Sequence, residues 1–230
     1  MSNTSLEVLY EDNHILAINK KPSDIVQGDK TGDMPLSEKA KQYIKEKYQK
    51  PGEVFLGVAH RIDRPVSGVI LFARTGKALE RLNEMFQKKE IRKTYWAVVK
   101  NMPKASSGKL VDFLRKNEQN NTSKAFEKEV AGSKKAELEY TLIASSDRYH
   151  LLEINPLTGR HHQIRVQLSA MGCPIKGDLK YGFDRSNENG SIHLHARKIN
   201  LTHPVKKTPL EIFADPPNDP LWNAFLKSNG

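Results

Sequence analysis

The chain has 230 residues, of which 37% are hydrophobic, so it is long enough for one large domain or two small ones with a substantial core. It carries 37 lysine and arginine residues against 27 acidic ones, and the formal net charge is +10. This charge favours an anionic partner, of which nucleic acid is the commonest for a soluble chain. A lysine-rich surface that serves solubility alone would give the same balance.

A single cysteine, Cys173, excludes an internal disulfide framework and fits a reducing cytoplasm, so we expect a cytoplasmic protein. The first 21 residues include acidic side chains and lack the continuous apolar core of a signal peptide. No apolar stretch approaches the roughly 20 residues that cross a bilayer. We therefore expect no membrane association.

Short apolar runs bounded by turn residues predict strands along the chain. In chain order these are residues 6–10, 14–20, 54–60, 68–74, 94–100, a hairpin over 136–155 with its turn at Ser145 to Asp147, 192–201 and 209–215. Apolar residues at helical spacing predict helices over 37–49 with Ser37 as N-cap, 77–90, 160–171 closed by Gly172, and 221–228.

Residues 101–135 are polar and rich in lysine, and we expect a mobile insertion in which 111–116 form at most a short strand. Strands outnumber helices, and most neighbours in sequence look antiparallel. The pattern predicts an α+β fold, built as a single domain over residues 1–230 around a large mixed, mostly antiparallel sheet with flanking helices.

Residues 60–75 read HRIDRPVSGVILFART and place Asp63 between a basic flank and a Ser-Gly turn that opens an apolar strand. An exposed aspartate has a pKa of about 3.9, and burial raises that pKa unless a cation lies within about 4–6 Å. A nucleophile or base at this position therefore needs a cation beside it. The alternative is an aspartate that caps a turn or pairs with Arg61 or Arg64.

Residues 157–168, LTGRHHQIRVQL, crowd Arg160, His161, His162 and Arg165 into the first turns of an expected helix. Cations are unfavourable at a helix N-terminus, so this pattern indicates pairing with a carboxylate or with phosphates. Adjacent histidines suggest zinc, but neighbouring helical positions point about 100° apart.

His193 and His195 share a face of their strand but lack a nearby cluster of cysteine or carboxylate ligands. We therefore expect no metal site. Tyr95 opens a strand beside Arg92 and Lys93; its ring is suited to stacking on a base and its hydroxyl to acid–base work, although a sheet-packing tyrosine is common.

Several familiar enzyme classes are excluded because the sequence lacks their motifs. Ile62 interrupts the HRD triplet of a kinase loop, and no glycine-rich phosphate loop, Walker A sequence or GxSxG elbow occurs. A glycosidase needs a second catalytic carboxylate, and none stands out.

Taken together, the segments resemble the RluA family of RNA pseudouridine synthases. The resemblance covers about residues 6–215 in order: HRIDRPVSGVILFART, RKTYWAVV, LTGRHHQIRVQL, GDLKYG and LHARKINLTHP. It implies the pseudouridine synthase fold with a central catalytic cleft. Many relatives carry an S4 RNA-binding domain before the core, and we expect none here because the first strand begins within about ten residues of the start.

The resemblance implies roles for three residues. Asp63 is the catalytic carboxylate, Tyr95 stacks on the target base and assists proton removal, and Arg165 pairs with Asp63 to keep it ionised. The remaining candidate site residues are expected to bind RNA; they are His60, Arg61, Arg64, Lys93, Arg160 and His162. Arg61 enters the RNA stack as the target uridine leaves it, while His60 and Arg160 support the loop and the phosphates.

The implied reaction converts uridine in ribosomal or transfer RNA to pseudouridine without gain or loss of atoms, so no cofactor and no metal are expected. Asp63 either attacks the ribose or withdraws a ribose proton to give a glycal, and the sequence leaves this choice open. We expect a monomer whose partner is RNA. The alternative is a non-catalytic RNA-binding or RNA-chaperone protein that retains the fold.

Overall fold

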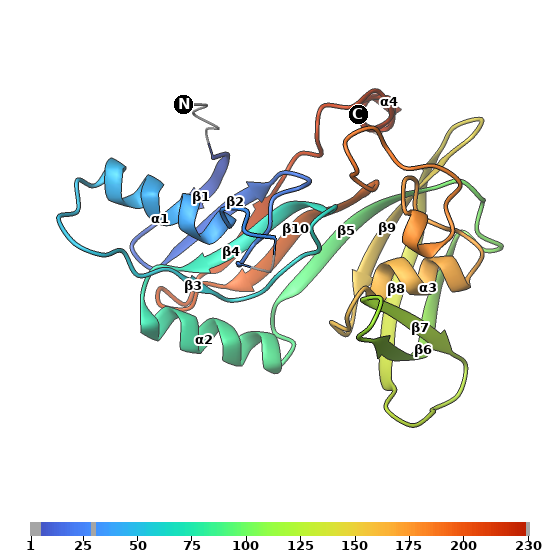
Figure 1. Ribbon diagram of the computed structural model, residues 1–230, viewed down its shortest axis with the longest axis horizontal. Helices are drawn as coiled ribbons and strands as arrows, with labels where there is room; N and C mark the ends of the chain where they lie inside the picture. The colour runs from blue at the N-terminus through green and yellow to red at the C-terminus, as the bar shows by residue number, and fades with distance from the viewer. Residues whose placement is uncertain (1–5, 29–30, 229–230) are drawn as a thin grey trace. The chain divides into compact units, whose positions relative to one another are not determined.

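The computed structural model describes residues 6–28 and 31–228. The chain folds into two compact units (Figure 1). The first unit combines residues 1–92 with 196–216, and the second combines 93–195 with 217–230. Within the described ranges no helix is both long and apolar enough to cross a membrane.

The first unit is built on antiparallel strands covered by two helices. Its strands are β1 (Val8–Glu11), β2 (Ile15–Lys20), β3 (Gly57–Val58), β4 (Ser67–Ala73), β10 (Leu194–Thr202, in this unit from Ala196 onward) and β11 (Pro209–Phe213). Their order is β1-β2-β4-β10, with β3 also paired to β4 and β11 to β10. The helices are α1 (Leu36–Lys47) and α2 (Gly76–Gln87).

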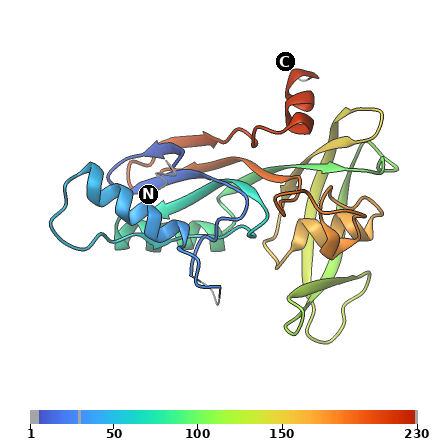
Figure 2. The same cartoon turned by 45° about the horizontal axis from the view of Figure 1, so that its top comes forward.

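The two helices lie on opposite faces of β2 and β4 (Figure 2). Successive residues of a strand point to opposite faces, so Ile70 packs with α1 while Leu71 packs with α2. Both faces are therefore buried, which explains why 68–73 form one uninterrupted apolar run instead of an alternating one. The loop that carries Asp63 thus leads directly into a fully buried strand.

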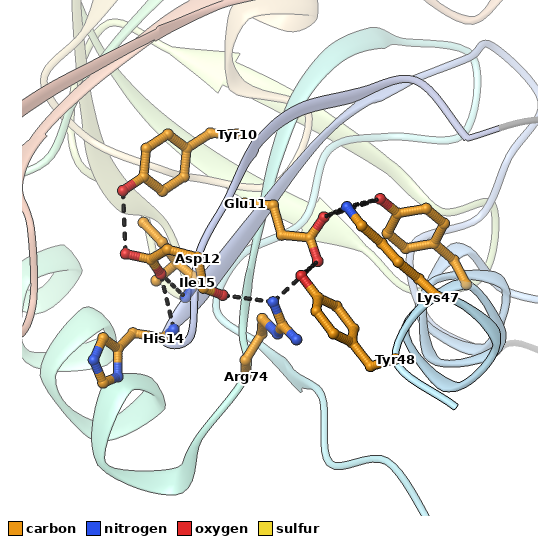
Figure 3. Close-up of polar contacts among 9 residues, drawn as sticks. Tyr10, Glu11, Asp12, His14, Ile15, Lys47, Tyr48 and Arg74 are labelled. Carbon is orange, nitrogen blue, oxygen red and sulfur yellow. Dashed lines mark hydrogen bonds and ion pairs between the residues drawn. The ribbon is translucent and has the colours of Figure 1, made fainter. Parts of the chain in front are cut away.

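Polar contacts at the β1–β2 turn tie the hairpin to α1 and to the end of β4 (Figure 3). Glu11 pairs with Arg74 at 3.0 Å and with Lys47 at 2.6 Å, and it accepts a hydrogen bond from Tyr48. Arg74 also donates to the carbonyl of Asp12 at 2.6 Å. Burial by itself raises the pKa of Glu11, but the bonds from Lys47 and Tyr48 outweigh it and lower that pKa.

The described residues of the second unit form five strands besides the first two residues of β10, in the order β5-β9-β8-β6-β7, each antiparallel to its neighbour. They are β5 (Arg92–Val99), β6 (Ser107–Asn117), β7 (Thr122–Phe126), β8 (Lys134–Ser145) and β9 (His150–Pro156). The helices are α3 (Gln163–Ala170), the short 3-10 helix η1 (Leu179–Tyr181) and α4 (Pro220–Ser228). The α+β class and the mostly antiparallel sheet are confirmed.

The prediction of a mobile insertion over 101–135 is wrong. Residues 107–117 and 122–126 of the segment form β6 and β7, and β6 pairs with β8 from Ser107 to Leu114. The main-chain hydrogen bonds of a sheet ladder need no large apolar side chains, so a polar, lysine-rich sequence conceals a long strand. Leu114 is the one buried residue of β6.

Three predicted boundaries are also wrong. The strand predicted over 54–60 is reduced to β3, because the chain on either side of Gly57–Val58 leaves the ladder with β4. Helix α1 begins at Leu36 after Pro35, so Ser37 lies inside the helix and is not its N-cap. Helix α3 begins at Gln163, because His162 adopts left-handed backbone angles.

Gly68 is the residue of β4 at which a side chain has no room. Its φ is +115°, and a Cβ placed there would lie 2.6 Å from the backbone nitrogen of Ala196 on β10. We expect Gly68→Ala to lower the free energy of unfolding by about 2–5 kcal/mol, as measured by urea denaturation. Gly76→Ala is the matched control, because nothing lies within 4 Å of that position, and it should stabilise by up to about 1 kcal/mol. Equal effects of the two substitutions would contradict this account.

Candidate active site

Asp63 lies in the first unit, on the loop between β3 and β4, and is partly buried. Its carbonyl accepts a hydrogen bond from the amide of Val66 at 3.0 Å, which closes a tight turn. Arg64 is exposed and pairs with Asp33 at 2.6 Å, and Arg61 is exposed beside it. The turn therefore directs two arginines outward on either side of a more buried carboxylate.

Lys20 holds this turn in place through hydrogen bonds to backbone carbonyls. Its ammonium group donates to the carbonyls of Lys21 at 2.9 Å, Arg64 at 3.0 Å and Val66 at 2.7 Å, and the residue is only 1% exposed. Three acceptors match the three donors of an ammonium group. Two of those carbonyls belong to the turn of Asp63, so the end of β2 holds the loop of the candidate catalytic carboxylate.

Burial lowers the pKa of Lys20 to about 7, while the negative charges of Asp24 and Asp63 oppose that fall. The sequence predicted a cation near Asp63 but did not indicate that Lys20 is one. The available signal was a lysine at the end of an otherwise buried strand, directly before Lys21-Pro22.

His60 has a structural contact in this unit. Its Nε2 accepts a hydrogen bond from the amide of Leu71 on β4 at 3.0 Å, and its ring lies 5.0 Å from that of Phe86. Because Nε2 acts as an acceptor, the hydrogen-bond pattern assigns an unprotonated Nε2. His60 thus replaces a strand partner at the point where β3 has left the ladder.

In the second unit, Arg165 forms a buried two-bond ion pair with Asp178. Its Nε and Nη2 donate to the two carboxylate oxygens at 2.7 and 2.8 Å, and both side chains are at most 6% exposed. The ring of Tyr181 lies 5.1 Å from the guanidinium carbon. The planar guanidinium is therefore held in one orientation by groups from the GDLKYG turn.

Asp178 is a residue that the sequence reasoning missed as a partner of Arg165. Asp178 lies in the GDLKYG segment, which is part of the resemblance but to which the sequence assigned no role. The predicted pair of Arg165 with Asp63 joins residues of different units and stays a prediction.

The two histidines before α3 are used within the second unit. His162 is buried, its Nδ1 lies 2.7 Å from the hydroxyl of Tyr181, and its ring stacks on that of His161 at 3.8 Å. The same hydroxyl accepts from the amide of Ser123 on β7 at 2.8 Å. Among the described residues no cluster of three or more histidine, cysteine, aspartate or glutamate side chains is placed to hold a metal ion.

The other candidate residues of this unit lie near the start of β5 and the TGR turn. Tyr95 is 8% exposed and pairs with Ile154 of β9. Burial lowers the pKa of Lys93. The Nζ of Lys93 lies within van der Waals contact distance of the place that a Cβ on Gly159 would occupy, so the two residues are neighbours. Arg160 is exposed and donates to the carbonyl of Lys135 at 2.9 Å. The second unit thus brings two types of group, an aromatic ring and cations, to neighbouring segments.

The comparisons with known proteins agree with this architecture. The family described as RNA pseudouridylate synthase matches residues 14–170. The chain is 31% identical to the tRNA pseudouridine synthase C of Salmonella typhi, over 98% of this chain and 90% of that protein. It is 33% identical to the Ribosomal large subunit pseudouridine synthase C of Vibrio vulnificus, over 90% of this chain but only 64% of that longer protein.

Among solved structures, Human RNA Pseudouridylate Synthase Domain Containing 4 superposes with a TM-score of 0.79 at 23% identity, covering 97% of this chain and 92% of that one. The fold is therefore that of the pseudouridylate synthases. The chain belongs to the RNA pseudouridylate synthase family, and the resemblance to its RluA-type members is confirmed.

The anchor at Lys20 yields a pH-dependent prediction. We expect Lys20→Met to lower the free energy of unfolding by about 1–3 kcal/mol, because buried carbonyls lose their donor. Below pH 7 the lysine is protonated in both the folded and the unfolded chain. Between about pH 7 and 10 the unfolded chain binds more protons, so Lys20 contributes stability that rises with pH, and the Lys20→Met variant would lack this rise. The free energies of unfolding of the wild type and of Lys20→Met should therefore diverge as the pH rises. Parallel pH profiles would contradict the lowered pKa of Lys20. Lys88→Met, at an exposed lysine, is the control.

The Arg165–Asp178 pair yields a second prediction. We expect Asp178→Asn to lower the free energy of unfolding by about 3–5 kcal/mol in urea, because the buried Arg165 loses the two charge-assisted hydrogen bonds to the Asp178 carboxylate. The control Lys116→Gln breaks an exposed pair with Glu118 and should cost at most about 1 kcal/mol. A cost for Asp178→Asn no greater than that of the control would show that Arg165 is held by other contacts.

Proposed function

We propose that the chain converts specific uridines of ribosomal or transfer RNA to pseudouridine, with Asp63 as the catalytic carboxylate. The observation that carries the proposal is the anchored turn: Lys20 binds the carbonyls of Arg64 and Val66 just after Asp63. A reactive group is effective when its own support is rigid. The names of the relatives, a ribosomal and a transfer RNA pseudouridine synthase, support the RNA substrate.

The reaction breaks the bond between ribose and the ring nitrogen, turns the uracil, and forms a carbon–carbon bond at carbon 5. In this proposal Asp63 acts on the ribose, Tyr95 stacks on the base and assists the final proton removal, and Arg165 pairs with Asp63. The bonds to Asp178 fix the orientation of the Arg165 guanidinium, as such a role requires. Since the substrate and product are isomers, the proposed reaction uses no cofactor and no metal.

The target base must leave its stack before it reaches Asp63, at a cost of a few kcal/mol. In our proposal the exposed Arg61 and Arg64 enter the RNA as the base leaves, and Lys93, Arg160, His60 and His162 support the site. Cations that contact phosphates release counterions, so RNA affinity should fall as salt rises. We propose that the protein works as a monomer in the cytoplasm.

The test uses Asp63→Asn, which keeps the shape of the side chain and removes its charge. Transcripts of ribosomal and transfer RNA are incubated with the protein, and pseudouridines are mapped by carbodiimide modification. We expect Asp63→Asn to abolish pseudouridine formation while RNA affinity stays within a few fold, and Asp147→Asn in the exposed β8–β9 turn to behave as wild type. Full activity of Asp63→Asn would refute the role of Asp63. Tight RNA binding by a wild-type protein that modifies no transcript would favour the non-catalytic alternative.

A further inference from the structure

A pocket of about 400 Å³ opens in the second unit, beyond the end of β5. Its lining contains three cations, two aromatic rings and one acid: Lys100, Lys176, Arg185, Tyr149, Phe183 and Asp184. None of these residues belongs to the candidate site around Asp63, Tyr95 and Arg165. The lining combines cations, which can contact a phosphate, with rings, which can stack on a base.

The pocket has an excess of positive charge. Asp184 pairs with Lys100 at 2.6 Å, which leaves more cationic than acidic side chains in the lining. The ammonium group of Lys176 donates to Asn187 at 2.6 Å, and Asn187 in turn donates to Ser191. Lys176 is therefore held in place at the pocket wall and not free to turn into solvent.

Packing supports the ring of Tyr149, and a backbone turn precedes that of Phe183. Tyr149 is half-buried and packs against the apolar cluster formed by Val98, Leu151 and Trp222. Phe183 is half-buried and follows Gly182, whose φ of +91° turns the chain after η1. Rings on a fixed support are suited to stacking on a base, which is favourable for every base because each has a π-face.

The pocket lies at a distance from Tyr95 that one RNA strand can span. Tyr95 stands near the start of β5, and Lys100 directly follows its end. Five residues of a strand cover about 16 Å at ~3.3 Å each. This equals about five stacked nucleotides at ~3.4 Å each.

We propose that this pocket binds a nucleotide of the RNA substrate several nucleotides away from the target uridine, with its phosphate at Lys100, Lys176 and Arg185 and its base against Tyr149 and Phe183. The proposal rests on the proposed function in so far as the RNA is the substrate. The pocket then adds affinity outside the reacting centre and helps to select RNAs in which a second nucleotide is accessible. An incoming phosphate competes with Asp184 for Lys100.

The test measures binding of a fluorescein-labelled oligouridylate of 20 nucleotides by anisotropy over a range of salt concentrations. For the 20-mer, Lys100→Gln/Arg185→Gln should weaken binding and reduce the slope of log affinity against log salt by about 0.7 per lost phosphate contact. Phe183→Leu should weaken binding at least about five-fold without changing that slope. The control Lys88→Gln/Lys116→Gln removes the same charge from exposed pairs outside the pocket and should have little effect.

A second measurement on the wild type needs no variant to fold: bound 20-mer should shield Lys100 and Lys176 from acetylation, read by mass spectrometry, and leave Lys88 unshielded. Pocket variants that bind the 20-mer as tightly as the control overturn the proposal. Shielding by uridine monophosphate but not by the 20-mer also overturns it, since the pocket then takes a free nucleotide.

These outcomes are separate from those of the proposed function. A wild-type protein that forms no pseudouridine but shows the pocket-dependent salt slope would refute the activity and keep the pocket as an RNA site. Normal pseudouridine formation, together with unchanged RNA binding by the pocket variants, would support the activity and refute the pocket as an RNA site.

Discussion

The buried ammonium group of Lys20 is the constraint on which the candidate site of the first unit depends. Placing a lysine at 1% exposure is costly unless each of its donors finds an acceptor, and here the three acceptors are backbone carbonyls. Because the carbonyls of Arg64 and Val66 belong to the turn of Asp63, the same bonds that offset the burial of Lys20 also set the path of that turn. Stability and positioning of the carboxylate therefore come from one interaction.

In the second unit a buried ion pair likewise holds a candidate site residue in place. A buried ion pair such as Arg165–Asp178 adds little net stability over apolar residues of similar volume, because desolvation offsets the attraction. What such a pair does provide is a fixed direction for the guanidinium. In the first unit Lys20 holds the backbone turn of Asp63, and in the second Asp178 fixes the guanidinium of Arg165. Our proposed mechanism needs both candidate groups in defined positions, and each has a side chain only 1% exposed, Lys20 or Asp178, as its support.

Local patterns predicted the elements whose burial follows from their own sequence. The two-sided apolar run of β4 and the apolar stripe of α2 lie close to where periodicity placed them. The elements that were predicted incorrectly depend instead on partners that are distant in the sequence. Strand β6 was predicted only as a short strand over 111–116, because main-chain pairing with β8, and not an apolar face, holds it in place. Residues 54–60 looked like one strand, but only Gly57–Val58 keeps a partner on β4. The start of α3 was misplaced because the left-handed backbone of His162 depends on its surroundings.

The sequence by itself determined the family, the order of its motifs and the identity of the candidate catalytic residues, because these are properties of residue type and spacing. Only the tertiary structure decided which groups hold them. Lys20 and Asp178 lie 43 and 13 residues from the residues they support, on segments that local periodicity cannot relate to one another. Their roles arise from hydrogen-bond geometry and burial, which exist only once strands and turns distant in the sequence have packed together.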